Sequence, residues 1–180
     1  MDSEASPDYL DMQMRLLGQV IYWSSVMERT LPSAFCSLVG SKYAAIVAAE
    51  MSAAQLIDLC AALVKAHREM PEPKRTAIID ALTLCASANI KRNTLVHGVK
   101  TDVTAHDGSF KTIKVRRRDY KVAVEVWTPE ALNAACQELG RAHIELFGAM
   151  QAAVSSEIMV MDEALAWEDD FDVNGSGNAT

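Results

Sequence analysis

Apolar residues recur at the spacing of an α-helix through most of the chain, and this pattern limits the fold more than any other feature. In the first long stretch, Leu10, Met14, Leu17 and Ile21 stand at positions i, i+4, i+7 and i+11. A helix with this spacing has one continuous apolar side, which must be buried against other elements. The pattern predicts a bundle of amphipathic helices.

Prolines and glycines divide this pattern into separate helices. The first helix should run from Asp8 to about Thr30, because Pro32 lacks an N–H donor and ends or kinks it, with a further turn or two before Gly40. Further helices are expected at 41–49, from Ser52 to Pro71, from Lys74 to Val96 and from Pro129 to about Leu165. Ser52 and Thr128 are favourable N-terminal caps, and Gly98 is a favourable C-terminal cap.

Residues 99–126 have a different character. β-forming residues fill 99–104 and 110–115, with Asp107-Gly108 between them, and 121–126 could supply a third strand. We therefore expect an all-α fold, a bundle of four or five helices, with a small β-hairpin insert at about 99–126 between the last two long helices. Residues 8–166 would form this single domain, after a disordered lead at 1–7 and before a disordered acidic tail at 167–180.

Composition limits location and cofactors. No apolar run is free of charges for the length of a membrane span, and the N-terminus is acidic, so we expect a cytoplasmic protein with no membrane contact. The four cysteines are isolated in apolar helical stretches, which favours core thiols over a disulfide or a zinc site. No metal and no cofactor are expected.

The net charge of −7 conceals an uneven distribution. Residues 1–11 hold four acids and residues 162–180 hold six, so residues 12–161 carry 17 bases against 14 acids. Nine of those bases lie within 91–121, against three acids. A positive patch of this kind attracts a polyanion, although a solvated hairpin face is the simpler explanation. The basic residues that could follow an RNA backbone are Lys91, Lys114, Arg116, Arg117 and Arg118.

The motif Lys91 to Gly98 reads K-R-N-T-L-V-H-G and ends the fourth expected helix. A guanidinium is costly to bury, so Arg92 must be paired, exposed, or held ready for an anion. Cleavage of RNA by its own 2′-hydroxyl needs a base, an acid and cations for the phosphate. Histidine serves as base or acid near neutral pH, and arginine matches phosphate oxygens. A simpler role for His97 is to complement the helix dipole.

An all-α bundle with R-N-x-x-x-H at the end of a core helix resembles the HEPN superfamily, across roughly residues 8–160. The resemblance implies a metal-independent endoribonuclease with Arg92 and His97 as catalytic residues. Asn93 would orient them, unless it only bonds to the backbone of the helix end. Glu28 is the candidate for the acidic residue that the family often places on an earlier helix, although pairing in solvent also explains it. The hairpin insert does not match the family.

Geometry adds an expectation about assembly. Arg92 and His97 are five residues apart and would point about 140° apart on an ideal helix, whereas Asn93 and His97 share a face. The site would then need a distorted helix end or a second copy. The resemblance implies the second solution, a homodimer with a composite RNA-cleaving cleft. His67, His106 and His143 are expected to be structural.

Two functions follow from these residues. The first is RNA cleavage. The resemblance to the HEPN superfamily implies a toxin, stress-response or phage-defence setting for it, in which a separate antitoxin or regulatory protein would be a further partner. The second is a non-catalytic HEPN-like module that binds nucleic acid or a protein and uses Arg92 and His97 to hold its dimer or its helix end. In either case the acidic tail could contact the basic patch.

Overall fold

The computed structural model describes residues 7–101, 109–116 and 121–154, and this part of the chain is mainly α-helical. It contains five helices and one three-stranded sheet, between the fourth and fifth helices as predicted. The elements are α1 (Pro7–Val39), α2 (Ala44–Ala49), α3 (Ala53–Ala66), α4 (Glu72–His97), β1 (Val99–Thr101), β2 (Phe110–Arg116), β3 (Lys121–Trp127) and α5 (Pro129–Val154).

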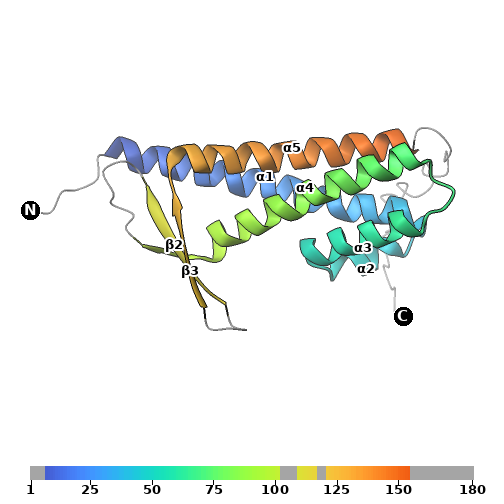
Figure 1. The fold of residues 1–180 in the computed structure, drawn as a ribbon, viewed down its shortest axis with the longest axis horizontal. Helices are drawn as coiled ribbons and strands as arrows, with labels where there is room; N and C mark the ends of the chain where they lie inside the picture. The colour runs from blue at the N-terminus through green and yellow to red at the C-terminus, as the bar shows by residue number, and fades with distance from the viewer. Residues whose placement is uncertain (1–6, 102–108, 117–120, 155–180) are drawn as a thin grey trace, which may run out of the picture.

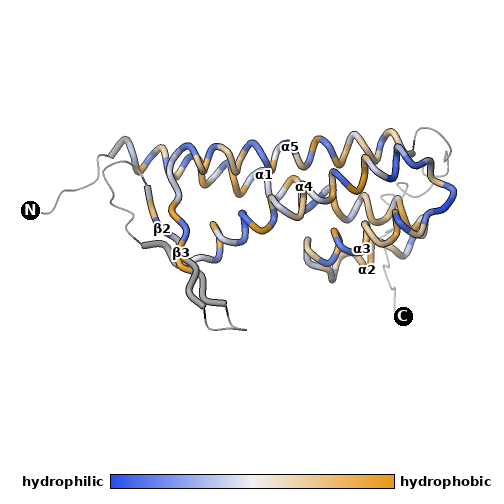
Figure 2. Tube along the Cα trace, in the orientation of Figure 1, coloured by the Kyte–Doolittle hydropathy of each residue, from blue (hydrophilic) through white to orange (hydrophobic). Residues whose placement is uncertain are grey.

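Helices α1 and α5 pack side by side along the long axis, and α4 packs against both (Figure 1). Helices α2 and α3 cover α1 and α4 toward one end, and the sheet lies at the other end, where α4 finishes. The centre is filled by fully buried aliphatic side chains from the three long helices, which include Met27, Leu31, Ile78, Leu82, Leu132, Leu139 and Leu146. Apolar and polar residues alternate along the helices, while the link from α3 to α4 is polar (Figure 2).

The sequence predicts that Pro32 ends or kinks the first helix, with a further turn or two before Gly40. It does not end the helix, because α1 continues through this proline to Val39. A proline inside a helix removes one backbone hydrogen bond and crowds the preceding turn. Here Leu31 and Phe35, on either side of Pro32, are buried in the core. Tertiary packing on both sides therefore holds the helix together across the proline.

The predicted caps of the shorter and later helices are confirmed. Ser52 caps α3 in a reciprocal arrangement, in which its hydroxyl accepts the Gln55 N–H (3.3 Å) and the Gln55 side chain accepts the Ser52 N–H (2.9 Å). At α5, the Thr128 hydroxyl accepts the Ala131 N–H at 3.2 Å, with Pro129 as the first helical residue. The expected extension of α5 to Leu165, residues 1–6 and the acidic tail lie outside the described residues.

The three strands form an antiparallel sheet in the order β1-β2-β3. Val99 pairs with Ile113, and Phe110 pairs with Trp127. Phe110, Thr112 and Trp127 are buried, and the Trp127 indole N–H donates to the Thr112 hydroxyl at 3.0 Å. One face of the sheet therefore closes the end of the helical core, whereas Val124 and Val126 on β3 are exposed.

Gly98 joins α4 to this sheet, and it caps α4 in a different way from the one predicted. Its φ of −71° and ψ of 140° are extended, so it does not adopt the left-handed conformation of a usual glycine cap. A Cβ atom at this position would lie 2.5 Å from the Thr94 carbonyl oxygen and 2.8 Å from the Thr112 Cβ. Close approach of β2 to the helix end, rather than backbone conformation, requires glycine here.

We predict that Gly98→Ala destabilises the fold by about 1–3 kcal/mol, because the added methyl overpacks the junction of α4 with β2. The matched control is Gly148→Ala in the middle of α5, where a Cβ meets nothing within 4 Å. Helix propensity should make that variant more stable by about 0.5–1 kcal/mol. Chemical denaturation of the three proteins measures both effects. Equal stability of Gly98→Ala and wild type would contradict the close contact.

No helix within the described ranges combines the length and apolar character needed to cross a membrane.

Candidate functional site

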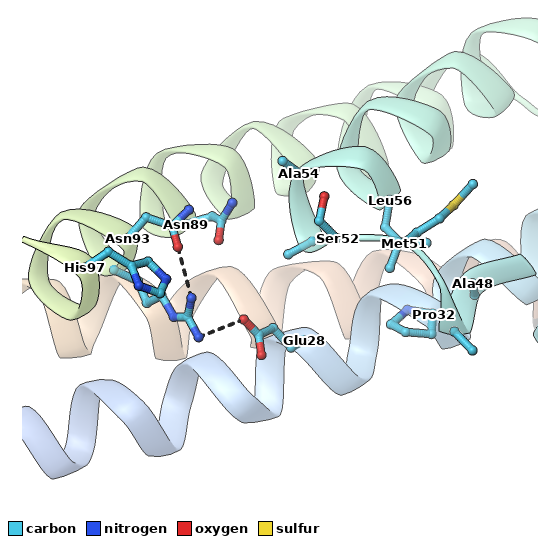
Figure 3. A pocket seen from close by; sticks show the side chains of 13 residues that line it. Glu28, Pro32, Ala48, Met51, Ser52, Ala54, Leu56, Asn89, Asn93 and His97 are labelled. Atoms are coloured by element: carbon cyan, nitrogen blue, oxygen red, sulfur yellow. Dashed lines mark hydrogen bonds and ion pairs between the residues drawn. The ribbon is translucent and has the colours of Figure 1, made fainter. Parts of the chain in front are cut away.

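A pocket of about 570 Å³ opens between α1, α4 and the start of α3. Figure 3 shows Asn89, Asn93 and His97 along α4, with Glu28 across from them on α1 and Ser52 and Ala54 at the start of α3. The residues that line it are Glu28, Pro32, Ala48, Ala49, Met51, Ser52, Ala53, Ala54, Leu56, Asn89, Arg92, Asn93 and His97. The pocket therefore contains all four residues predicted to be catalytic.

Helix periodicity brings the polar side chains of α4 to this pocket. Asn89, Asn93 and His97 stand at i, i+4 and i+8, so they follow one face of the helix. Leu95 points the other way and is fully buried in the core. The end of α4 thus presents an apolar side to the bundle and a polar side to the pocket.

Arg92 is the most constrained of these side chains. It is 21% exposed, and its Nη2 lies 3.2 Å from the Glu28 Oε1 on α1, which forms an ion pair between the two helices. Its Nη1–H donates to the Asn93 Oδ1 at 2.9 Å. Its Nε is buried and has no hydrogen-bond partner among the described residues. The guanidinium charge is therefore compensated, but one of its donors is left without an acceptor.

The predicted separation of Arg92 and His97 on α4 does not keep them out of a common site. Both side chains line the pocket, although α4 is helical throughout from Glu72 to His97. Asn89 and Asn93 lie between them on the helix surface. The long Arg92 side chain reaches Glu28 on α1. Neither a distorted helix end nor a second copy is needed to bring the two side chains to one pocket.

The pocket also contains residues that the motif did not indicate. Asn89 is 6% exposed, and the first residues of α3, Ser52 to Ala54, form the wall opposite α4. Asn89 could have been found from its i, i+4, i+8 relation to Asn93 and His97. No local signal places the start of α3 beside α4, because this proximity arises from the packing of α3 against α1 and α4.

The basic residues predicted to bind RNA lie on different elements of the structure. Lys91 points away from the pocket and forms an ion pair with Glu138 on α5, which also accepts from the Ser87 hydroxyl at 2.6 Å. Lys114 and Arg116 belong to β2, the strand that contacts α4. Arg117 and Arg118, together with His106, fall outside the described residues.

Among the described residues, the other histidines and the cysteines lie outside this pocket. His143 shares a hydrogen bond of 2.8 Å with the Thr30 hydroxyl, and His67 is the C-terminal cap residue of α3. Burial raises the pKa of Cys60 to about 11 and that of Cys85 to about 12, so both thiols stay protonated at neutral pH. Within the described ranges, no group of three or more His, Cys, Asp or Glu is arranged to hold a metal ion.

Comparison with protein-family models, with curated proteins and with solved structures found no match for this chain. The resemblance to the HEPN superfamily therefore stays a prediction from the motif and its setting.

The Glu138 contacts give a prediction about pH. Burial raises the pKa of this carboxyl, but hydrogen bonds from Lys91 and Ser87 outweigh burial, so the pKa is lowered in the folded protein. A lowered pKa stabilises the fold above the usual carboxyl range, and that contribution is lost as the pH falls through the folded-state pKa.

Glu138→Gln should therefore destabilise the fold by about 0.5–1 kcal/mol at pH 7, and the difference from wild type should shrink as the pH falls below the usual carboxyl range. Glu145→Gln, which removes an exposed pairing with Arg141 on the same helix, is the control and should change stability little. Denaturant titrations at several pH values measure both variants. A Glu138→Gln difference that does not depend on pH would contradict the pairing.

Proposed function

We propose that this chain is a metal-independent endoribonuclease of HEPN type, built on a HEPN-like helical bundle. The observation that carries the proposal is that Arg92, Asn93, His97 and Glu28 line one pocket. An arginine, a histidine and supporting polar groups in one cleft are what cleavage of RNA by its own 2′-hydroxyl requires.

The roles follow from the positions of the side chains. His97 is exposed at the end of α4, where an RNA strand could reach it, and it would take the proton from the 2′-hydroxyl. The 2′-oxygen then bonds to the adjacent phosphorus, and the bond from phosphorus to the 5′-oxygen breaks. Arg92 would balance the charge on the phosphate oxygens, and Glu28 and Asn93 would hold the guanidinium in place.

The reaction also needs an acid that protonates the departing 5′-oxygen. The pocket of one chain contains a single histidine. A second copy of the chain would bring a second histidine to a shared cleft, which is the chemical argument for a homodimer. Ile90 stands seven residues before His97, on the same face of α4, and is 65% exposed. A second copy that docked beside the motif would cover this side chain.

The sheet would extend the RNA path beyond the pocket. Some of the basic residues on β2 and just after it, Lys114, Arg116, Arg117 and Arg118, would contact phosphates of the same strand, since such contacts need charge and little base-specific geometry. Neighbouring residues of a strand face opposite sides, so not all four would do so. The toxin, stress-response or phage-defence setting, and a separate antitoxin or regulatory protein, follow from the HEPN resemblance.

One observation favours the rival function, a HEPN-like module that binds nucleic acid or protein without catalysis. Both terminal nitrogens of Arg92 are already engaged, one by Glu28 and one by Asn93. An arginine in such contacts can serve to hold α4 against α1. The two functions differ in what substitution of His97 does, because an exposed histidine at a helix end carries little of the fold.

The first test is RNA cleavage by the purified protein in EDTA. Wild type should cleave, and His97→Ala should lower the rate by about 10²–10⁴-fold because the proton acceptor is lost. Arg92→Ala should lower it at least as strongly. His67→Ala and Arg141→Ala are matched controls, since both side chains are exposed and lie outside the pocket. Wild type that leaves RNA intact, or a His97→Ala variant as active as wild type, would contradict the nuclease.

The second test addresses the dimer by light scattering after size-exclusion chromatography. Wild type should be a dimer, and Ile90→Asp should make it a monomer that keeps its helical content and loses cleavage. Ile144→Asp, on α5 with a similar exposure of 63%, should stay dimeric. A monomeric wild type would contradict the shared cleft. A dimer that is lost with Ile144→Asp and kept with Ile90→Asp would place the interface away from the motif.

A further inference from the structure

The start of α3 offers hydrogen-bond donors to the pocket from the side opposite α4. The first N–H groups of a helix have no acceptor within it, and the helix dipole makes this end positive. In α3, which has 14 residues, the capping arrangement of Ser52 and Gln55 satisfies the Gln55 N–H. The N–H groups of Ala53 and Ala54 come before it and have no acceptor among the described residues. Both residues line the pocket.

The opposite wall supplies a second, independent observation. Asn89 lines the pocket and is 6% exposed, and Figure 3 shows its carboxamide turned toward the space between α4 and α1. Its side chain has no hydrogen bond to any described residue. The Arg92 Nε beside it is buried and without a partner as well. Side chains that are largely buried are normally satisfied, so the unpaired Asn89 amide on one wall and the N–H groups of Ala53 and Ala54 on the other point to a ligand rich in acceptors.

The charges of the pocket indicate which kind of ligand this is. Its charged side chains are Glu28 and Arg92, which pair with each other, so the positive end of α3 determines the remaining sign. Backbone N–H groups at a helix start, with an amide and a guanidinium opposite, are the groups that bind phosphate oxygens. A carboxylate ligand has fewer oxygen acceptors than a phosphate group, so it would use fewer of these donors.

The remaining lining suits the rest of a nucleotide. Pro32, Met51 and Leu56 form an apolar part of the wall, next to the start of α3. A volume of about 570 Å³ lies within the range of small-molecule sites in proteins. A phosphate held at the start of α3 would bring its attached sugar or base against this apolar part.

We propose that the pocket contains a phosphate-binding subsite between the N–H groups of Ala53 and Ala54 on α3 and the side chains of Asn89 and Arg92 on α4. The phosphate belongs to the backbone of the bound RNA and lies next to the phosphate that is cleaved. That identity rests on the proposed nuclease, whereas the binding of phosphate itself does not.

The test removes one donor without changing a side-chain charge. Ala53→Pro deletes the N–H at the first helical position, where proline is favoured, and Ser52, with φ −72° and ψ 157°, already has the conformation that a following proline requires. Ala53→Ser keeps the N–H and is the matched control. Asn89→Leu, which has nearly the same shape, tests the opposite wall. Circular dichroism and thermal melting establish that each variant is folded.

Inorganic phosphate is titrated while the backbone amide resonances are followed by NMR. In wild type and Ala53→Ser, the Ala54 amide should shift with saturation, together with the Asn89 side-chain amide. Affinity should fall by about tenfold in Ala53→Pro and in Asn89→Leu, since each loses one hydrogen bond to a charged group. Unchanged affinity in a folded Ala53→Pro variant, or shifts confined to other parts of the chain, would overturn the subsite.

Two further titrations identify the source of the phosphate. A 2′-O-methyl oligonucleotide, which cannot be cleaved by 2′-attack, should bind more tightly than inorganic phosphate and lose about tenfold in affinity with Ala53→Pro. A response to inorganic phosphate and a mononucleotide, but not to the oligonucleotide, would overturn the RNA assignment. Phosphate binding without RNA cleavage in EDTA would remove the nuclease and keep the subsite, so the two failures are distinguishable.

Discussion

The packing of α4 into the bundle is the constraint on which the rest of the structure depends. Its apolar side is held by α5, and its other side faces α1 and α3, so its last turns must meet both a core and an open pocket. Arg92 joins these two surroundings, since its guanidinium reaches Glu28 on α1 while its Nε stays buried and without a partner. Partial burial of a charge is tolerated only with such pairing. The same contact that holds α4 against α1 therefore also builds the polar wall of the pocket.

Much of this fold could be predicted from local chemistry. Ser52 and Thr128 cap their helices because their hydroxyls accept free N–H groups, and the β-forming runs around Asp107-Gly108 and after Lys121 do form strands. Predictions failed where distant packing decided the outcome. Pro32 does not end α1, because buried neighbours hold the helix on both sides, and Gly98 is required by the approach of Thr112 from β2 rather than by its own backbone.

The candidate site could also be predicted where local chemistry decides the outcome, and not where distant packing does. The motif indicated Arg92, Asn93 and His97 by residue type and spacing, but helix geometry alone placed Arg92 and His97 too far apart to share a face. The long arginine side chain reaches Glu28 on α1, and this brings Arg92 to the pocket that His97 also lines. Asn89 needed its i+4 and i+8 neighbours to be noticed, and the start of α3 could not be assigned without the tertiary structure. Lys91, although adjacent in sequence, is held on the other side by Glu138.

The central claim is that this pocket uses the RNA's own 2′-hydroxyl as the nucleophile, and the chemistry of the cut ends tests it most directly. Mass spectrometry of fragments from a defined RNA, cleaved in EDTA, should find a 2′,3′-cyclic phosphate on one fragment and a 5′-hydroxyl on the other. A single 2′-deoxy nucleotide at the cleaved position should block the cut. Fragments that end in 3′-hydroxyl and 5′-phosphate, or cleavage that continues at the 2′-deoxy position, would contradict the account.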